Sequence, residues 1–136
     1  DFYKNINEIK YLLNKFKTNE QCYLKKVQDY VSIIFPYSKF KNIIFYPSVG
    51  YDIGIGMKNI VCINFNSNIF FVNFKEIISL LIHETTHVVY ERYNEPVIGI
   101  EKIASEISMK EFLDYYIHYE GLALIIHLLR ISNLIT

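Results

Sequence analysis

With 136 residues, the chain is long enough for one domain with a hydrophobic core and too short for two ordinary domains. Hydrophobic residues make up 51% of it and charged residues 21%, which is the composition of a folded protein and not of a disordered one. Basic and acidic residues balance at 14 each, so the net charge gives no reason to expect binding to nucleic acid or attraction to a membrane surface.

The first 36 residues predict two amphipathic helices. Apolar residues recur at helical spacing over residues 5–16, and Thr18 followed by Gln21 is a capping pattern that predicts the start of a second helix. Pro36 lacks the backbone N–H that a helix interior needs, so the second helix should end near it. We expect this N-terminal part, residues 1–36, to be scaffold.

Residues 40–66 have the pattern of short strands. A β-branched and aromatic run over residues 42–47 ends at Pro47, and a second run covers residues 60–66. We expect these runs to form a small antiparallel or mixed sheet. The strand over residues 60–65 is either an edge to which an extended peptide substrate adds, or an ordinary internal strand.

Three of the five glycines lie between these two runs, in a stretch that predicts a hairpin or a bulged strand. The spacing of Gly50, Gly54 and Gly56 matches neither the dinucleotide-binding fingerprint nor the Walker pattern. We therefore expect no nucleotide ligand.

Two long helices are predicted in the second half of the chain. Asn73, with Glu76 three residues later, predicts the start of the first helix, over residues 73–93. The Ser108–Glu111 capping box predicts the start of the second helix, over residues 108–131.

The order of these elements predicts an α+β fold in a single domain that spans residues 1–136. No apolar run approaches the about 20 residues that a membrane-spanning helix needs, and the N-terminus does not resemble a signal peptide. Cys22 and Cys62 lie far apart, and we expect two free, buried thiols and no disulfide framework. These features favour a cytoplasmic protein without a membrane span.

The stretch LLIHETTHVVY, residues 80–90, carries the strongest chemical signal. His83 and His87 lie four residues apart, so a helix places them on one face, one turn apart, where their ring nitrogens can bind a common zinc ion. Glu84 points about 100° around the helix from His83, from where it can reach a water molecule without being a ligand. This is the HExxH arrangement of two metal ligands and a general base.

The alternative is that these are interior histidines bonded to backbone carbonyls. A single histidine on an apolar helix favours that interpretation. Two histidines at ligand spacing with an acid between them do not, because a charged Glu84 among apolar neighbours is costly to bury without a partner or a task.

A catalytic zinc ion needs a third protein ligand and an open position for water. Glu91 lies one turn beyond His87 on the same helix, and three successive turns of a straight helix cannot surround one ion. The candidates are Glu106, which follows His87 at a spacing seen in some peptidases with two histidines and one glutamate, and Glu120.

Glu120 is the preferred candidate, although Glu106 remains open. Glu120 lies in an apolar helix, where an ionised carboxylate is costly unless a positive group meets it. Gly121 is disfavoured by about 1 kcal/mol relative to Ala in a helix interior. This predicts that the histidine helix packs closely against Gly121 and Ala123.

The motif HETTH followed by EGLA resembles the gluzincin branch of the zinc metallopeptidases, and is most similar to small predicted zinc-dependent proteases. The similarity covers about residues 42–127. It implies a zincin-like fold in which the HExxH helix packs against the glutamate helix. It also implies Zn²⁺ as the cofactor, His83, His87 and Glu120 as its ligands, Glu84 as the catalytic base, and a peptide or protein substrate.

Catalysis would also need a donor for the developing oxyanion. Tyr116 and His127 share the face of Glu120 on the last helix and are the candidates, whereas His118 and Tyr119 are expected to point elsewhere. The sequence therefore predicts a zinc peptidase. The rival hypotheses are a non-catalytic zinc-binding domain on the same fold, a zinc hydrolase of a non-peptide amide, and an interaction protein without metal.

Overall fold

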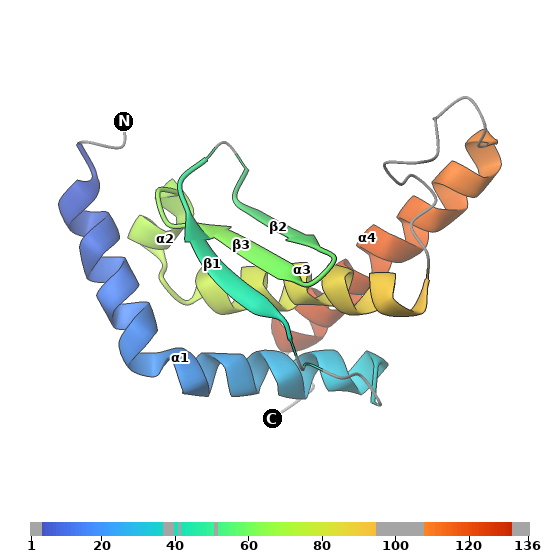
Figure 1. Ribbon diagram of the computed structural model, residues 1–136, viewed down its shortest axis with the longest axis horizontal. Coiled ribbons are helices and arrows are strands. Elements are labelled where there is room, and N and C mark those ends of the chain that lie inside the picture. Colours follow the sequence, from blue (N-terminus) through green and yellow to red (C-terminus); the bar gives the residue numbers. More distant parts are fainter. Residues whose placement is uncertain (1–3, 37–39, 41, 51, 95–107, 132–136) are drawn as a thin grey trace.

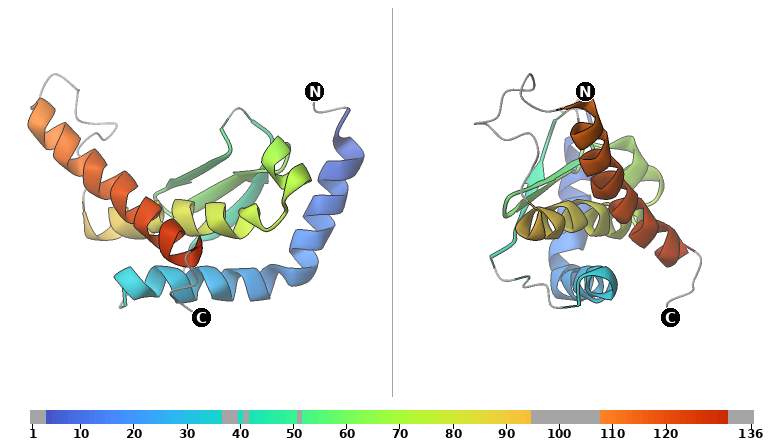
Figure 2. Two further views of the ribbon diagram at one scale, coloured as in Figure 1. Left: turned by 180° about the vertical axis from the view of Figure 1, so that it is seen from behind. Right: turned by 90° about the vertical axis from the view of Figure 1, so that its right-hand side faces the viewer.

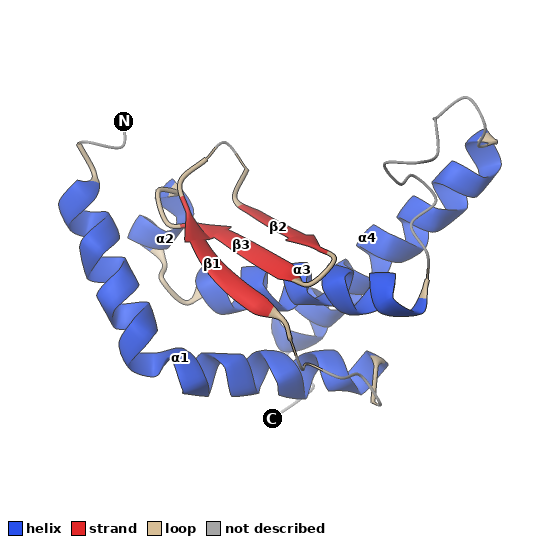
Figure 3. Ribbon diagram, in the orientation of Figure 1, coloured by secondary structure: helices blue, strands red, loops and turns tan. Residues whose placement is uncertain are grey.

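The computed structural model describes residues 4–36, 40, 42–50, 52–94 and 108–131. In this part of the chain, four helices and three strands form an α+β fold, which confirms the predicted class (Figures 1 and 3). The elements, in chain order, are α1 (Ile6–Ile34), β1 (Ile44–Ser48), β2 (Gly54–Met57), β3 (Ile60–Asn64), α2 (Asn68–Val72), α3 (Glu76–Tyr93) and α4 (Met109–Ile131).

The sheet is mixed, with the strand order β1-β3-β2. β3 pairs in parallel with β1 and antiparallel with β2, so the strand predicted over residues 60–65 is the internal one and β2 lies at an edge. β1 continues through Pro47, where the sequence predicted its end. The Ser48 carbonyl accepts from the N–H of Phe65, the residue after β3, so the preceding Pro47 faces the free edge, where its missing N–H breaks no ladder bond.

α1 is one helix, and the prediction of two separate helices is wrong. The Thr18 hydroxyl donates to the carbonyl of Asn14, and the Asn19 amide donates to the carbonyl of Lys15, so neither side chain caps a new helix. Side chains that bond back to carbonyls four residues earlier bend a helix, and Figure 1 shows α1 bending sharply near its middle.

The sequence predicted the start of α4 correctly, but it placed the start of α3 three residues too early. The Ser108–Glu111 capping box is present: the Ser108 hydroxyl accepts from the Glu111 N–H at 3.2 Å, and the Glu111 carboxylate accepts from the Ser108 N–H at 3.0 Å. α3 begins at Glu76 and not at Asn73, because the Asn73 side chain forms a turn with the N–H of Lys75 before the helix starts.

α3 is the central element of the core. It contacts the sheet, α1 and α4, and the end-on view in Figure 2 shows these elements on different sides of it. Every residue from Glu84 to Tyr90 is buried, as expected of a helix that is covered all round. The buried apolar cluster to which α3 contributes also includes Ile9, Leu12, Val27 and Val31 of α1, and Val61 and Ile63 of β3.

None of the described helices is long and apolar enough to cross a membrane. Both cysteines are free, as predicted. Cys62 is half-buried on β3, but Cys22 is exposed on α1, so the expectation that both thiols are buried is wrong. The buried apolar residues of α1 lie on one face of the helix, and Cys22 lies outside that face.

Candidate metal centre

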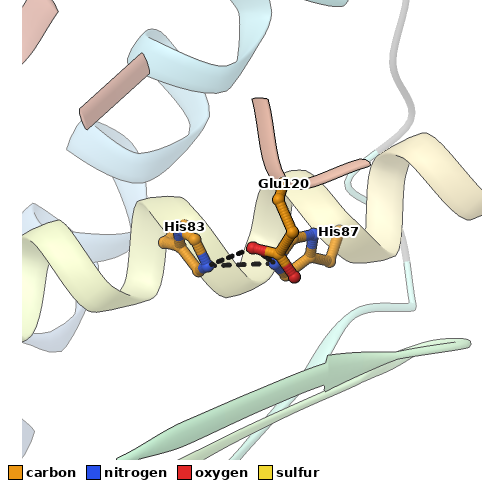
Figure 4. Close-up of side chains that lie close together, drawn as sticks. All are labelled: His83, His87 and Glu120. Atoms are coloured by element: carbon orange, nitrogen blue, oxygen red, sulfur yellow. Dashed lines mark hydrogen bonds and ion pairs between the residues drawn. The ribbon is translucent and has the colours of Figure 1, made fainter. Parts of the chain in front are cut away.

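α3 and α4 bring together the three residues that the sequence proposed as zinc ligands (Figure 4). The Nε2 atoms of His83 and His87 lie 3.0 Å apart. The Oε2 atom of Glu120 lies 3.6 Å from each of them. Two residues of one helix and one residue of another therefore direct their ligand atoms at a common point.

These distances fit a single tetrahedral ion. Two ligand atoms at about 2.0–2.1 Å from zinc lie about 3.3–3.4 Å apart at the tetrahedral angle. The observed separations of 3.0 Å and 3.6 Å bracket that value. The side chain of Glu120 is 56% exposed, so the centre lies where solvent and a substrate can reach it.

His87 is held in the protonation state that a metal ligand requires. Burial, together with the neighbouring His83, lowers the pKa of His87 to about 3, so its imidazole is neutral at pH 7. Its Nδ1 atom is buried and has no hydrogen-bond partner within the described residues. Metal-binding histidines usually donate this second nitrogen to a carboxylate or carbonyl that orients the ring. Here the orientation of the ring must come from another contact.

Glu84 is buried beside the ligands but is not part of the group that His83, His87 and Glu120 form. Burial raises the pKa of Glu84; a hydrogen bond from the Gly56 N–H lowers it, the charges of Glu120 and Asp52 add to the rise, and the net result is a pKa of about 7. A carboxylate with a pKa near neutrality can accept a proton and release it again at pH 7, as a general base must.

Gly54 and Gly56 allow β2 to lie directly against α3 at Glu84. A β-carbon on Gly56 would overlap the backbone of Glu84, and one on Gly54 would lie 3.0 Å from the Glu84 carboxylate oxygen Oε1. This role of the two glycines was not predicted from the sequence. Two glycines two residues apart on a strand share one face, and that spacing is the signal that would have predicted a close approach.

A cleft of about 580 Å³ adjoins the centre and reaches both His83 and Glu84. Its walls are largely apolar and come from the loop before β2, from α2, from α3 and from α4. The apolar lining residues are Ile53, Ile69, Phe70, Leu80 and Leu124. The cleft therefore places an apolar surface beside the candidate base.

Glu91 lies away from the ligand atoms, as predicted. Its Oε2 accepts the backbone N–H of Lys58 at 2.7 Å, in the turn between β2 and β3, and its Oε1 lies 3.4 Å from the Tyr119 hydroxyl. The carboxylate of Glu91 thus ties the end of α3 to the β2–β3 hairpin.

Glu120 was preferred as a ligand because an apolar environment was expected around it, and that expectation is wrong. Glu120 is exposed and not stranded in an apolar interior, and no described atom lies within 4 Å of a β-carbon placed on Gly121. α4 instead packs through Tyr119 and the fully buried Ala123, which are four residues apart. Glu120 and Gly121 lie beside this packed stripe, so Ala123 is the small residue at the interface and Gly121 is not.

The remaining candidates have different outcomes. Tyr116 lies on α4 one turn before Glu120, and its ring contacts Phe112, Tyr115 and Tyr119. These contacts do not test its role as oxyanion donor. The side chain of His127 and all of Glu106 lie outside the described residues.

Tyr119 was expected to point away from the site and does not: its ring stacks on His87 at a centroid distance of 3.9 Å. The helical spacing placed Tyr119 correctly relative to Glu120, but the crossing of α4 over α3 was needed to show that this face meets His87.

Comparisons of the chain with protein-family models, with curated proteins and with solved structures find no match. The motif and the geometry of the site are therefore what indicate a function.

Proposed function

We propose that this chain is a zinc-dependent peptidase of zincin-like fold. His83, His87 and Glu120 hold the ion, and Glu84 is the general base. The observation that carries the proposal is the convergence of the three ligand atoms from two helices at 3.0 Å and 3.6 Å. The resemblance of HETTH and EGLA to the gluzincin peptidases supports the same assignment.

His83, His87 and Glu120 would hold a zinc ion, which would supply a Lewis acid for the substrate carbonyl and for a water molecule. Glu84 accepts the proton of the attacking water on its carboxylate and delivers it to the leaving amine. Its burial and the Gly56 N–H hold the carboxylate in one position, and its pKa of about 7 suits both transfers.

The cleft beside His83 and Glu84 is the proposed substrate site. It borders the base directly, and its apolar residues offer a surface on which a substrate side chain can pack. A peptide with an apolar side chain next to the scissile bond would bury that side chain against Ile69, Phe70 and Leu80. A peptide or protein substrate is thus preferred over a small polar amide.

The decisive experiment measures bound zinc in the purified wild type, in Glu120→Ala and in Glu106→Ala, alongside hydrolysis of a broad peptide library. We expect about one zinc ion in the wild type and in Glu106→Ala, and little in Glu120→Ala. A wild type without zinc contradicts the proposal. Zinc that is retained in Glu120→Ala but lost in Glu106→Ala would reassign the third ligand.

The peptide library separates the rival functions. A zinc-loaded wild type that hydrolyses no peptide, under conditions where it hydrolyses simple amides, would favour the non-peptide amidase. A zinc-loaded wild type that hydrolyses neither would favour a non-catalytic zinc domain. The buried carboxylate of Glu84 at the end of a cleft argues against the latter, because a purely structural metal site has no use for a base.

A further inference from the structure

Tyr119, the residue directly before Glu120, makes one contact with a candidate metal ligand and two contacts beside the centre. Its ring stacks on the ring of His87, with a centroid distance of 3.9 Å and an interplanar angle of 16°. Its hydroxyl lies 3.2 Å from the carbonyl oxygen of Gly56 and 3.4 Å from the carboxylate of Glu91. One side chain of α4 therefore contacts both the histidine helix and the edge strand.

The stacked ring compensates for a missing hydrogen bond. His87 is buried, and its Nδ1 has no partner in the described part of the chain, so no hydrogen bond at Nδ1 helps to fix the rotation of the ring. The ring of Tyr119 covers one face of His87, while the edge of the His83 ring meets it at a centroid distance of 4.5 Å and an angle of 87°. Packing against two rings restricts the plane of the His87 ring, and in this plane Nε2 faces the common point.

The hydroxyl of Tyr119 acts on the other side of the site, through Gly56. The Asn64 N–H donates to the Ile53 carbonyl, and β2–β3 pairing alternates from there, so Ile55 and Met57 bond to β3. The N–H and carbonyl of Gly56 consequently point to the free edge of β2. The carbonyl accepts from Tyr119, and the N–H donates to the carboxylate of Glu84.

The same hydroxyl reaches the hairpin by a second route. Its other neighbour is the Glu91 carboxylate, which itself accepts from the backbone N–H of Lys58 in the turn between β2 and β3. The hydroxyl has one proton to donate. Whether it donates to the Gly56 carbonyl or to the Glu91 carboxylate, the bond anchors α4 to the β2–β3 hairpin, which packs against Glu84.

We propose that Tyr119 is a positioning residue of the metal centre: its ring orients His87 as a ligand, and its hydroxyl holds Gly56 against Glu84. The first half rests on the proposed metal centre; the second concerns the polypeptide alone. The two halves predict different consequences for Tyr119→Leu, which loses ring and hydroxyl, and for Tyr119→Phe, which loses only the hydroxyl.

The ring is tested by the zinc dissociation constant, measured by competition with a chromophoric chelator. We expect Tyr119→Leu to bind zinc about 10- to 100-fold more weakly than wild type and Tyr119→Phe to stay within about threefold of it. The Co²⁺-substituted Tyr119→Leu should also show shifted d–d absorption bands. Tyr115→Leu is the matched control, because Tyr115 stacks on Tyr119 from one turn away and has no described contact with His87. We expect it to bind zinc like the wild type.

The hydroxyl is tested without metal, by amide hydrogen exchange followed by NMR. The Gly56 amide should exchange about tenfold faster in both Tyr119→Phe and Tyr119→Leu, while the Ile55 and Met57 amides, bonded to β3, should change little. Unchanged exchange at Gly56 in Tyr119→Phe overturns this half of the proposal. Equal zinc affinities of Tyr119→Leu and Tyr115→Leu overturn the ring half alone, whereas a wild type that binds no zinc overturns the ring half together with the proposed function.

Discussion

A β-carbon on Gly56 would overlap the backbone carbonyl of Glu84, so β2 lies as close to α3 as only a glycine permits. No described glycine has a positive φ, so these glycines are needed for close packing and not for an unusual backbone conformation. The approach is what brings the Gly56 N–H to the carboxylate of Glu84.

Gly56→Ala should therefore damage both stability and the site. The added methyl group must push β2 away from α3, and we expect the free energy of unfolding to fall by about 1–3 kcal/mol, as in other overpacked interiors. Urea unfolding measures this change, and peptide hydrolysis should fall with it. Gly50→Ala is the matched control, because no described atom lies within 4 Å of the new methyl group. A Gly56→Ala variant as stable as Gly50→Ala would contradict the packing argument.

Glu84→Gln should separate catalysis from metal binding. The carboxylate of Glu84 does not belong to the ligand group, so bound zinc should remain at the wild-type level. The amide cannot accept the proton of water, and hydrolysis should fall by about 10²- to 10⁴-fold. Parallel zinc analysis and initial rates check both halves, with Glu8→Gln on the exposed side of α1 as control. Undiminished hydrolysis would remove Glu84 from the mechanism.

The metal-free protein should lose stability in acid in a way that depends on two opposed groups. His87 titrates near 6.5 when unfolded and near 3 when folded, so the unfolded state binds more protons, and stability falls as the pH drops from about 6.5 to about 3. Glu84 has an ordinary pKa of 4.5 and a folded pKa of about 7, so its contribution to stability grows as the pH drops from about 7 to 4.5.

The contributions of His87 and Glu84 to stability oppose each other between pH 4.5 and 6.5. Besides burial, His83 lowers the pKa of His87, and the charges of Glu120 and Asp52 raise the pKa of Glu84. The acid loss of stability in the wild type should therefore be concentrated below about pH 4.5. In Glu84→Gln the loss should begin near pH 6.5, where only His87 remains. Urea unfolding in the presence of a chelator, over pH 3–8, measures both curves. If stability falls with pH in the same way in both proteins, the two groups do not oppose each other and the prediction is wrong.

Gly121→Ala should stabilise the protein. The helix gains about 0.8–1.0 kcal/mol from the better intrinsic propensity of Ala, and no described atom opposes the new methyl group. Ala123→Gly, two residues away in the packed stripe, should do the reverse, because Ala123 is fully buried. Thermal unfolding of both variants decides the matter. A destabilised Gly121→Ala would restore the close approach that the sequence suggested.

The part of the candidate site that lies within one helix could be predicted from the sequence alone. Four residues of spacing place His83 and His87 on one face whatever surrounds them, and hydrogen bonds between neighbours in sequence set the Ser108 cap. The order of helical and strand patterns was likewise enough for the α+β class. The same local patterns failed where one side chain had two possible partners. Thr18 could cap a new helix or bond back to Asn14, and the continuous helix retained the second bond.

Only the tertiary structure decided how α4 meets α3. Glu120 was chosen because its carboxylate was expected to be buried, yet it is exposed; it reaches the histidines because the stripe of Tyr119 and Ala123 sets the crossing of the two helices. That crossing depends on contacts between residues far apart in the sequence, such as those of Tyr119 with His87 and Glu91, which no periodicity within either helix encodes. The same crossing turned Tyr119 onto His87 and Gly56, and the strand order placed β2, not β3, at the edge beside Glu84.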